Sequence, residues 1–248
     1  MAADTFGIVI ATNPVGYAEV EPLQSVDFAY YDEAYFYGAG LGVAGYRDYD
    51  RESPPYKLEF YSQAIERAVR NVDRPRVLDV GCAFGRLLAG LPPYFDRVGI
   101  DVSAYALKEA RRHVRDVRFV QAEMPPLGLG KFDAIAAFDV LEQVADPRAM
   151  LERLATMLAP NGEFLTVIPV YDGPLGWAQR LINDDPTRRH RLARQAWLDL
   201  IGAPFEIVEW RGIYRFLSAF GPYIHAPTRL LRASAPAIIV RARRRKRA

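Results

Sequence analysis

The chain has only one cysteine, Cys82, among its 248 residues. A single thiol excludes an internal disulfide framework and a zinc site built from several thiolates, so we expect a reducing compartment. The chain also lacks any apolar run near the roughly 18 residues of a membrane-spanning helix, and its first residues lack the basic and apolar regions of a secretory leader. These absences predict a cytoplasmic protein.

An excess of charge of one sign is also lacking, since 32 Lys and Arg residues face 30 Asp and Glu residues. Six of the cations lie in the basic tail, residues 241–248, and leaving them out changes the net charge from +2 to −4. A basic tail attracts nucleic acid or an anionic membrane in some proteins, but terminal charges are more often simply solvated. We therefore do not expect nucleic acid as a partner. Peripheral membrane contact remains an alternative that is not favoured, and the oligomeric state stays unknown.

Residues 1–54 are rich in aromatic residues and glycine. Disordered segments are poor in aromatic residues, so we expect this N-terminal arm to pack on the rest of the chain. Two interpretations stay open. The rings line the top of a pocket, with Tyr30 and Tyr46 as candidate substrate contacts, or they form a hydrophobic strap whose hydroxyls face water.

Residues 55–240 alternate between the hydrophobic periods of helices and strands. Helical patterns begin at Pro55, after Ser103, at Pro147 and at Ala193. Alternation of this kind predicts parallel βαβ units in one α/β domain, with helices on both faces of the sheet. The expected strands are residues 76–80, 97–101, 117–121, 132–138, 163–168, 205–210 and 235–240.

The stretch from Val77 to Gly85 reads Val-Leu-Asp-Val-Gly-Cys-Ala-Phe-Gly, which predicts a strand, a tight turn and a helix start. Glycine lets the backbone approach a ligand closely, and the N–H groups of the following helix would face that ligand. Asp101 follows Asp79 by 22 positions, near the ~20-residue offset of an acid that binds ribose hydroxyls. The pattern therefore predicts a nucleotide site at the carboxyl ends of the strands.

The acid in this turn helps to choose the nucleotide. A dinucleotide site would have Gly-x-Gly-x-x-Gly, where a helix start neutralises a pyrophosphate. Here Asp79 precedes Gly81 and Ala83 stands between the two glycines. An acid repels a pyrophosphate and attracts an ammonium, which favours a cofactor with a ribose and an amino-acid end, S-adenosylmethionine. Dinucleotide binding is the remaining alternative.

At this point the chain resembles the class I S-adenosylmethionine-dependent methyltransferases, over about Arg76 to Ile168. The resemblance implies a Rossmann-like three-layer sandwich with a mostly parallel seven-stranded sheet and an antiparallel last strand. Two positions depart from the family pattern: Ala83 replaces the middle glycine, and Gln143 stands where many relatives have histidine, so no base comes from that position. The cofactor-binding residues that the resemblance implies are Asp79, Gly81, Cys82, Ala83, Gly85, Asp101, Val102, Glu123, Met124, Phe138 and Asp139.

The methyl group of a sulfonium is already electrophilic, so catalysis can depend on holding a nucleophile in line while water is excluded. A base is optional, and histidine is the usual one near neutral pH. His190, in the insertion after the fifth strand, is the first candidate for a catalytic base, and His225 is the second. His113 is expected to be structural, because a cation suits the carboxyl end of a helix.

Two insertions, near residues 171–190 and 214–232, are expected to form lids together with the N-terminal arm. The aromatic residues Tyr171, Trp177 and Tyr214 are candidate contacts for a ring-bearing acceptor. If the acceptor is acidic instead, the candidate contacts are Arg188, Arg189 and Arg211. The acids at positions 172, 184 and 185 could in principle hold a divalent ion. No metal is predicted, because the acid at position 184 or 185 is better explained as the cap of a turn.

These observations predict an S-adenosylmethionine-dependent methyltransferase that acts by in-line displacement on a small molecule. The favoured acceptor atom is an oxygen of a sugar, a phenol or a secondary metabolite. Two alternatives stay open. One is a non-catalytic cofactor-binding or scaffold protein, for which Ala83 and Gln143 would be marks of lost activity. The other is an RNA methyltransferase that uses the basic tail.

Overall fold

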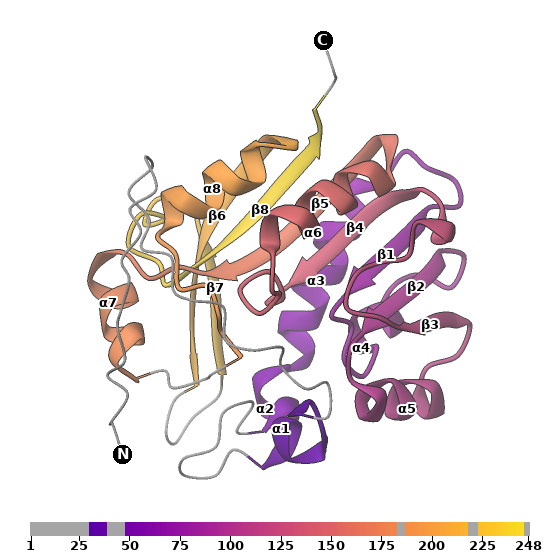
Figure 1. The fold of residues 1–248 in the computed structure, drawn as a ribbon, viewed down its shortest axis with the longest axis horizontal. Helices are drawn as coiled ribbons and strands as arrows, with labels where there is room; N and C mark the ends of the chain where they lie inside the picture. Colours follow the sequence, from indigo (N-terminus) through magenta and orange to yellow (C-terminus); the bar gives the residue numbers. More distant parts are fainter. Residues whose placement is uncertain (1–29, 39–47, 183–186, 218–222, 246–248) are drawn as a thin grey trace, which may run out of the picture.

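The computed structural model describes residues 30–38, 48–182, 187–217 and 223–245. Helices and strands alternate along most of this length (Figure 1). The helices are α1 Glu33–Tyr37, α2 Tyr49–Glu52, α3 Pro55–Ala68, α4 Arg86–Ala89, α5 Ala104–His113, the 3-10 helix η2 Leu127–Leu129, α6 Pro147–Met157, α7 Gly173–Ile182 and α8 Arg194–Gly202. The strands are β1 Arg76–Val80, β2 Asp96–Asp101, β3 Val117–Gln121, β4 Phe132–Phe138, β5 Leu158–Pro169, β6 Phe205–Leu217, β7 Tyr223–Thr228 and β8 Ala237–Arg244.

Eight strands of the described residues form one sheet in the order β3-β2-β1-β4-β5-β8-β6-β7. Strands β1 to β5 pair in parallel. Strand β8 is antiparallel to both β5 and β6, and β7 is antiparallel to β6 at the edge. The strand order reverses between β1 and β4, which is the place where open α/β sheets bind ligands.

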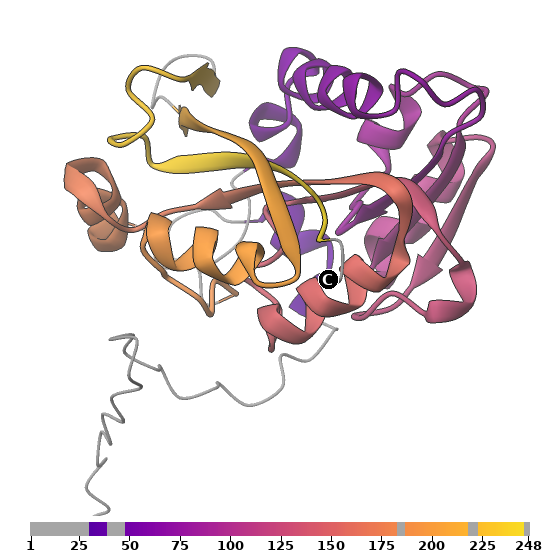
Figure 2. The same cartoon turned by 90° about the horizontal axis from the view of Figure 1, so that it is seen from above.

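Helices cover both faces of the sheet and make it the middle of three layers (Figure 2). Helices α3 and α4 pack on one face, where Val77 of β1 points, and helices α6 and α8 pack on the other, where Leu78 and Val80 point. Successive residues of a strand point to opposite faces, so a strand that is buried on both needs apolar residues throughout. The α/β, Rossmann-like fold that the sequence predicts is therefore confirmed.

The expected count of seven strands is wrong, because the described sheet has eight. Strand β6 does not end near residue 210 but continues to Leu217, and β7 pairs with it in the register Tyr214 to Ala226 and Arg215 to His225. Sequence analysis missed β7 because its extended conformation depends on pairing with β6. Its own residues include Pro227, and a proline argues against a strand. A role of residues 214–232 as a lid stays a prediction.

The last strand also extends beyond Val240, and the first residues of the basic tail belong to it. Arg243 donates to the buried Glu163 of β5 at 2.7 Å, and the guanidinium of Arg241 lies 3.6 Å from the same carboxylate. A run of arginines carries no hydrophobic strand pattern, so the sequence alone ends the strand too early. The pairing of these arginines with Glu163 matters because a buried carboxylate without a cationic partner is strongly destabilising.

The described part of the N-terminal arm packs on the body, as predicted. Tyr35 and Phe36 of α1 are buried with Tyr49 and with Phe84 of the glycine turn, and the ring centroids of Phe36 and Phe84 are 4.7 Å apart. Tyr46 lies outside the described residues. None of the helices in the described ranges combines the length and the apolar character needed to cross a membrane.

Candidate functional site

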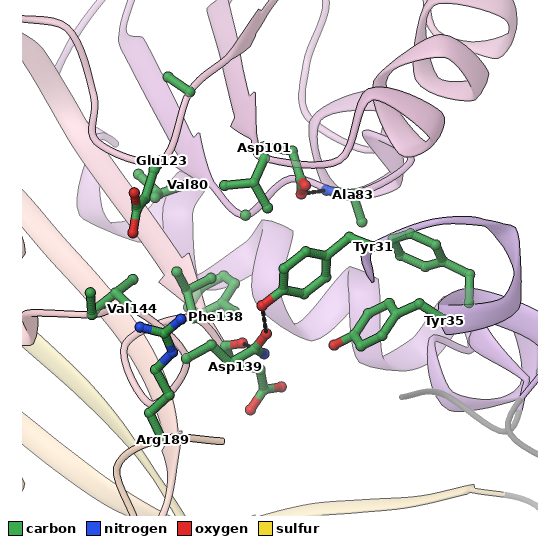
Figure 3. Close-up of a pocket in the computed structure, with 17 residues that line it drawn as sticks. Tyr31, Tyr35, Val80, Ala83, Asp101, Glu123, Phe138, Asp139, Val144 and Arg189 are labelled. Carbon is green, nitrogen blue, oxygen red and sulfur yellow. Dashed lines mark hydrogen bonds between the residues drawn. The ribbon is translucent and has the colours of Figure 1, made fainter. Parts of the chain in front are cut away.

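A pocket of about 540 Å³ lies at the carboxyl ends of β1, β2 and β4 (Figure 3). Its walls come from the glycine turn after β1, the loops after β2 and β3, the end of β4, helix α1 and the segment before α8. Seven of the eleven residues predicted to bind a cofactor line it: Gly81, Ala83, Asp101, Val102, Glu123, Phe138 and Asp139. The other four, Asp79, Cys82, Gly85 and Met124, do not line it.

The glycine turn brings backbone close to this pocket by using left-handed conformations. Gly81 has φ +72 and Gly85 has φ +68, and a Cβ at Gly81 would lie 2.3 Å from a methyl group of Val140. Ala83, which replaces the family's middle glycine, adopts φ +44. The turn therefore keeps a glycine-like shape at a position where an L side chain is disfavoured.

Asp101 is fixed at the centre of the site by two backbone donors. The Ala83 N–H donates to its Oδ2 and the Ser103 N–H donates to its Oδ1, each at 2.8 Å. Burial raises the pKa of Asp101, and the backbone N–H groups around it oppose that rise. Each carboxylate oxygen keeps a further lone pair, so the group can accept hydrogen bonds from two adjacent hydroxyls.

Asp79 lies under the turn and not in the pocket lining. Its side chain is buried, and its pKa is raised well above the usual value by that burial and by the nearby charge of Asp101. Cys82 is buried as well, which raises the pKa of its thiol. A role of Asp79 toward the amino end of a cofactor stays a prediction.

The opposite end of the pocket combines one carboxylate with apolar surface. Figure 3 shows Glu123, from the loop after β3, pointing into the same cavity as Asp101. Val102 and Ala122 line the pocket beside them. Apolar lining residues beside a carboxylate acceptor suit an adenine ring and its amino group.

Asp139 follows β4 with φ +60 and forms a buried ion pair with Arg215 of β6, at 2.5 Å. Burial raises the pKa of Asp139, but Arg215 and Lys57 outweigh this effect, so its pKa lies below the usual value. Sequence analysis predicted Asp139 but missed both cations. No local pattern could reveal them, because they come from β6 and α3.

Gln143 joins this group to the N-terminal arm. Its side-chain amide donates to the Asp139 carbonyl at 2.8 Å, and its Oε1 lies 3.5 Å from the Tyr31 hydroxyl. Tyr31 is held from the other side by the Ser103 hydroxyl, which donates to the Tyr31 carbonyl at 2.5 Å. The residue that replaces histidine thus connects one wall of the pocket to the aromatic arm.

Glu142 is fully buried beside this group, and neither of its carboxylate oxygens has a hydrogen-bond partner among the described residues. Burial, followed by the charge of Asp139, raises its pKa to about 8. The carboxyl group is therefore mostly protonated at neutral pH. Glu142 does not line the pocket, but its carbonyl accepts a hydrogen bond from the His190 N–H at 3.0 Å.

The two candidate bases lie next to the pocket and not in its lining. Nε2 of His190 lies 2.9 Å from the Val144 carbonyl. His225 packs against Tyr61, which itself stacks on the lining residue Phe138 at 4.3 Å. Burial, with the charge of Lys57, lowers the pKa of His225 to about 4, so its ring is neutral at neutral pH. Catalytic roles for both histidines stay predictions.

The aromatic residues that line the pocket are not those that sequence analysis selected. Tyr31, Tyr35 and Phe36 line it. Tyr31 comes directly before the N-cap Asp32, and Tyr35 and Phe36 follow it in α1, so an aromatic cluster around a helix start is the signal that could have identified them. None of the four described candidates is among the lining residues: Tyr30 is 36% exposed, Tyr171 is buried, Trp177 is 63% exposed, and the hydroxyl of Tyr214 hydrogen bonds to Ser234 at 2.6 Å.

One of the three candidate arginines, Arg189, lines the pocket. Arg188 lies 3.4 Å from the Tyr171 hydroxyl, and Arg211 donates to Glu209 at 2.8 Å. Asp172 accepts from Arg194 at 2.8 Å, and within the described ranges no cluster of three possible metal ligands is found. The acids at positions 184 and 185 lie outside the described residues.

Comparison with known proteins assigns the chain to a family. A family model described as a methyltransferase domain matches residues 49–209. A ubiquinone biosynthesis O-methyltransferase of Xanthomonas euvesicatoria pv. vesicatoria is 33% identical over 127 residues, which cover 46% of this chain and 49% of that protein. One of the same name from Alkalilimnicola ehrlichii is 29% identical over 119 residues, covering 45% and 47%. The chain thus spans about half the length of these curated relatives.

Solved structures share the fold at lower identity. The N-methyltransferase NodS of Bradyrhizobium japonicum WM9, in complex with S-adenosyl-L-homocysteine, has a TM-score of 0.55 and 18% identity, covering 79% of this chain and 90% of that one. Magnesium protoporphyrin IX methyltransferase of Synechocystis PCC 6803, with bound S-adenosylhomocysteine, has a TM-score of 0.54 and 18% identity, covering 77% and 83%.

Proposed function

Because the chain belongs to the class I S-adenosylmethionine-dependent methyltransferases, we propose that it transfers a methyl group from this cofactor to an oxygen of a small molecule. One observation carries the proposal. Two carboxylates from different strand ends, Asp101 and Glu123, point into one pocket above a glycine turn. This combination suits a ligand that has a ribose and an adenine but no phosphate.

The described residues fit the cofactor in three ways. Asp101 has free lone pairs for the ribose hydroxyls. The Glu123 carboxylate would accept a hydrogen bond from the adenine amino group, and Val102 would give the ring an apolar surface. Gly81 lacks a Cβ that would collide with Val140, which lets the backbone of the turn line the pocket. When bound, S-adenosylmethionine supplies an electrophilic methyl group, so the protein has to orient an acceptor and exclude water.

The acceptor is proposed to lie against the aromatic wall formed by Tyr31, Tyr35 and Phe36, which lines the same pocket. Rings of this kind suit a ring-bearing molecule such as a phenol, and they exclude water from the site. The names of the curated relatives, ubiquinone biosynthesis O-methyltransferases, support a small acceptor and transfer to oxygen. A sugar or another secondary metabolite remains within this class.

Transfer to an oxygen releases a proton, and His190 remains the candidate that would accept it. The segment from residue 187 to 190 runs along the pocket wall, because the His190 N–H donates to the Glu142 carbonyl and Arg189 lines the cavity. His225 is a weaker candidate. Its pKa of about 4 makes it a poor base, and Tyr61 contacts both its ring and the pocket residue Phe138.

The proposal is tested first by binding of the product cofactor. We expect S-adenosylhomocysteine to raise the melting temperature of the protein, and we expect Asp101→Ala to abolish the rise, because the ribose then loses its acceptor. Asp73→Ala is the matched control, since it removes an exposed acid from a loop outside the pocket. An unchanged melting temperature of the wild type at saturating S-adenosylhomocysteine would contradict the proposal.

Structural details weaken the two alternatives. Ala83 adopts the left-handed conformation and Gln143 connects Asp139 to Tyr31, so neither substitution has dismantled the site. Arg241 and Arg243 pair with Glu163, which leaves fewer cations of the basic tail for RNA. Methyl transfer to members of a small-molecule panel would separate the enzyme from a scaffold protein.

A further inference from the structure

Arg189 places a positive charge in the pocket, and its guanidinium has no ion-pair partner among the residues that the structure describes. Figure 3 shows its guanidinium reaching into the cavity near Val144 and Phe138. Its Nε is buried and has no hydrogen-bond partner, and no ion pair joins its side chain to any residue in the described part of the chain. Burial of an unpaired guanidinium costs free energy, unless a ligand supplies an anion that pairs with it.

Backbone contacts of Arg189 and its neighbours set its position. The Arg189 N–H donates to the carbonyl of the buried Thr187 at 3.0 Å. The next residue, His190, is held by the Glu142 carbonyl through its N–H and by the Val144 carbonyl through its ring. These contacts fix the backbone on both sides of Arg189 and direct its side chain toward the pocket.

The charges around the pocket indicate what the partner is. Among the described residues that line it, Arg189 is the one cation, and the carboxylates are Asp101, Glu123 and Asp139. Asp101 and Glu123 are assigned to the cofactor, and Asp139 already pairs with Arg215. The sulfonium of the cofactor would add a second positive charge to a pocket of low dielectric. An anion bound at the guanidinium would offset both positive charges.

We propose that the methyl acceptor carries an oxyanion group, a carboxylate or a phosphate, that binds to the guanidinium of Arg189. The inference rests on the proposed function and names the class of its acceptor. A guanidinium presents two parallel N–H donors, which match the geometry of either group and orient the molecule as well as bind it. The aromatic wall would then hold the rest of the acceptor.

The test uses protein saturated with S-adenosylhomocysteine and matched pairs of probes. One pair is 4-hydroxybenzoate and 4-hydroxybenzamide, and the other is phenyl phosphate and phenol. We expect the anionic member of at least one pair to bind about tenfold more tightly by calorimetry, as one charge-assisted interaction allows. Arg189→Gln should remove that preference and leave the neutral member unchanged, and Arg189→Lys should restore part of it.

Two controls keep the outcome interpretable. Arg191→Gln removes the same charge from the same segment at a residue that does not line the pocket, and it should keep the preference. Melting temperatures show whether each variant is folded. Equal binding within both pairs would overturn the inference. So would an Arg189→Gln variant that binds S-adenosylhomocysteine more weakly, because the arginine would then serve the carboxylate of the cofactor. Failure of the wild type to bind S-adenosylhomocysteine would instead contradict the proposed function itself.

Discussion

Ala83 holds a backbone conformation that glycine adopts at no steric cost. Its φ of +44 lies in the left-handed region, and its N–H donates to the carboxylate of Asp101 at 2.8 Å. A return to an ordinary conformation would move this N–H away from Asp101. The substitution therefore retains the shape of the site at a cost in stability, which is typical of strain that is kept near a binding site.

Ala83→Gly should relieve this strain. We expect an increase of about 0.5–1 kcal/mol in the free energy of unfolding, because an L residue with positive φ costs more than the extra freedom of glycine in the unfolded chain. Ala64→Gly in helix α3 is the control, and it should lower stability by about 1 kcal/mol. Urea unfolding measures both. A loss of stability in both variants would show that the turn is not strained at Ala83.

The hairpin of β6 and β7 is the element that joins the edge of the sheet to the pocket. Arg215 of this hairpin reaches Asp139, although the two lie 76 positions apart. Both side chains are nearly buried, with 9% and 16% of their surface exposed. The pair therefore fixes one pocket residue through a strand that forms no part of the cofactor motif.

Arg215→Met should leave the Asp139 carboxylate buried without its partner. We expect a loss of roughly 3–5 kcal/mol in the free energy of unfolding, because removal of one member of a buried ion pair leaves the charge of the other buried and uncompensated. The double variant Asp139→Asn with Arg215→Met should recover part of the loss.

An exposed pair in the same part of the sheet provides the control. Arg229 pairs with Glu209 but is 70% exposed, and Arg229→Met should cost about 1 kcal/mol or less. Urea unfolding of the three variants and the wild type forms the comparison. Equal losses for Arg215→Met and Arg229→Met would contradict the role assigned to the buried pair.

At the scale of the whole molecule, strand β8 joins two parts of the sheet. It lies between β5 and β6, and it pairs with β5 from Ala237 to Arg243 and with β6 from Ala237 to Arg244. Its last residues are cationic and belong to the tail that the sequence alone suggests is solvated. The cationic residues at the start of the tail thus belong to a strand in the interior of the sheet.

Truncation separates these two roles of the tail. A chain that ends after Val240 should lose cooperative unfolding, because it removes half of β8 and leaves the buried carboxylate of Glu163 without Arg243. A chain that ends after Arg245 keeps the whole strand, and its free energy of unfolding should change by less than about 0.5 kcal/mol. Circular dichroism during urea unfolding measures both. A stable chain ending after Val240 would contradict the structural role of residues 241–244.

The sequence by itself determined the features that depend on neighbours along the chain. Strands β1, β3 and β4 begin and end where their apolar runs do, and Ser103 caps helix α5, as its pattern predicts. Spacing alone placed Asp101 and the glycine turn in one site. These features follow from backbone geometry and side-chain period, which act over a few residues.

Only the tertiary structure decided which side chains meet above that turn. It placed Tyr31 and Arg189 in the pocket and left Trp177 exposed. It also paired Asp139 with Arg215. Such contacts join elements far apart in the sequence, and their selection depends on the packing of the whole sheet and its helices, to which no local pattern is sensitive.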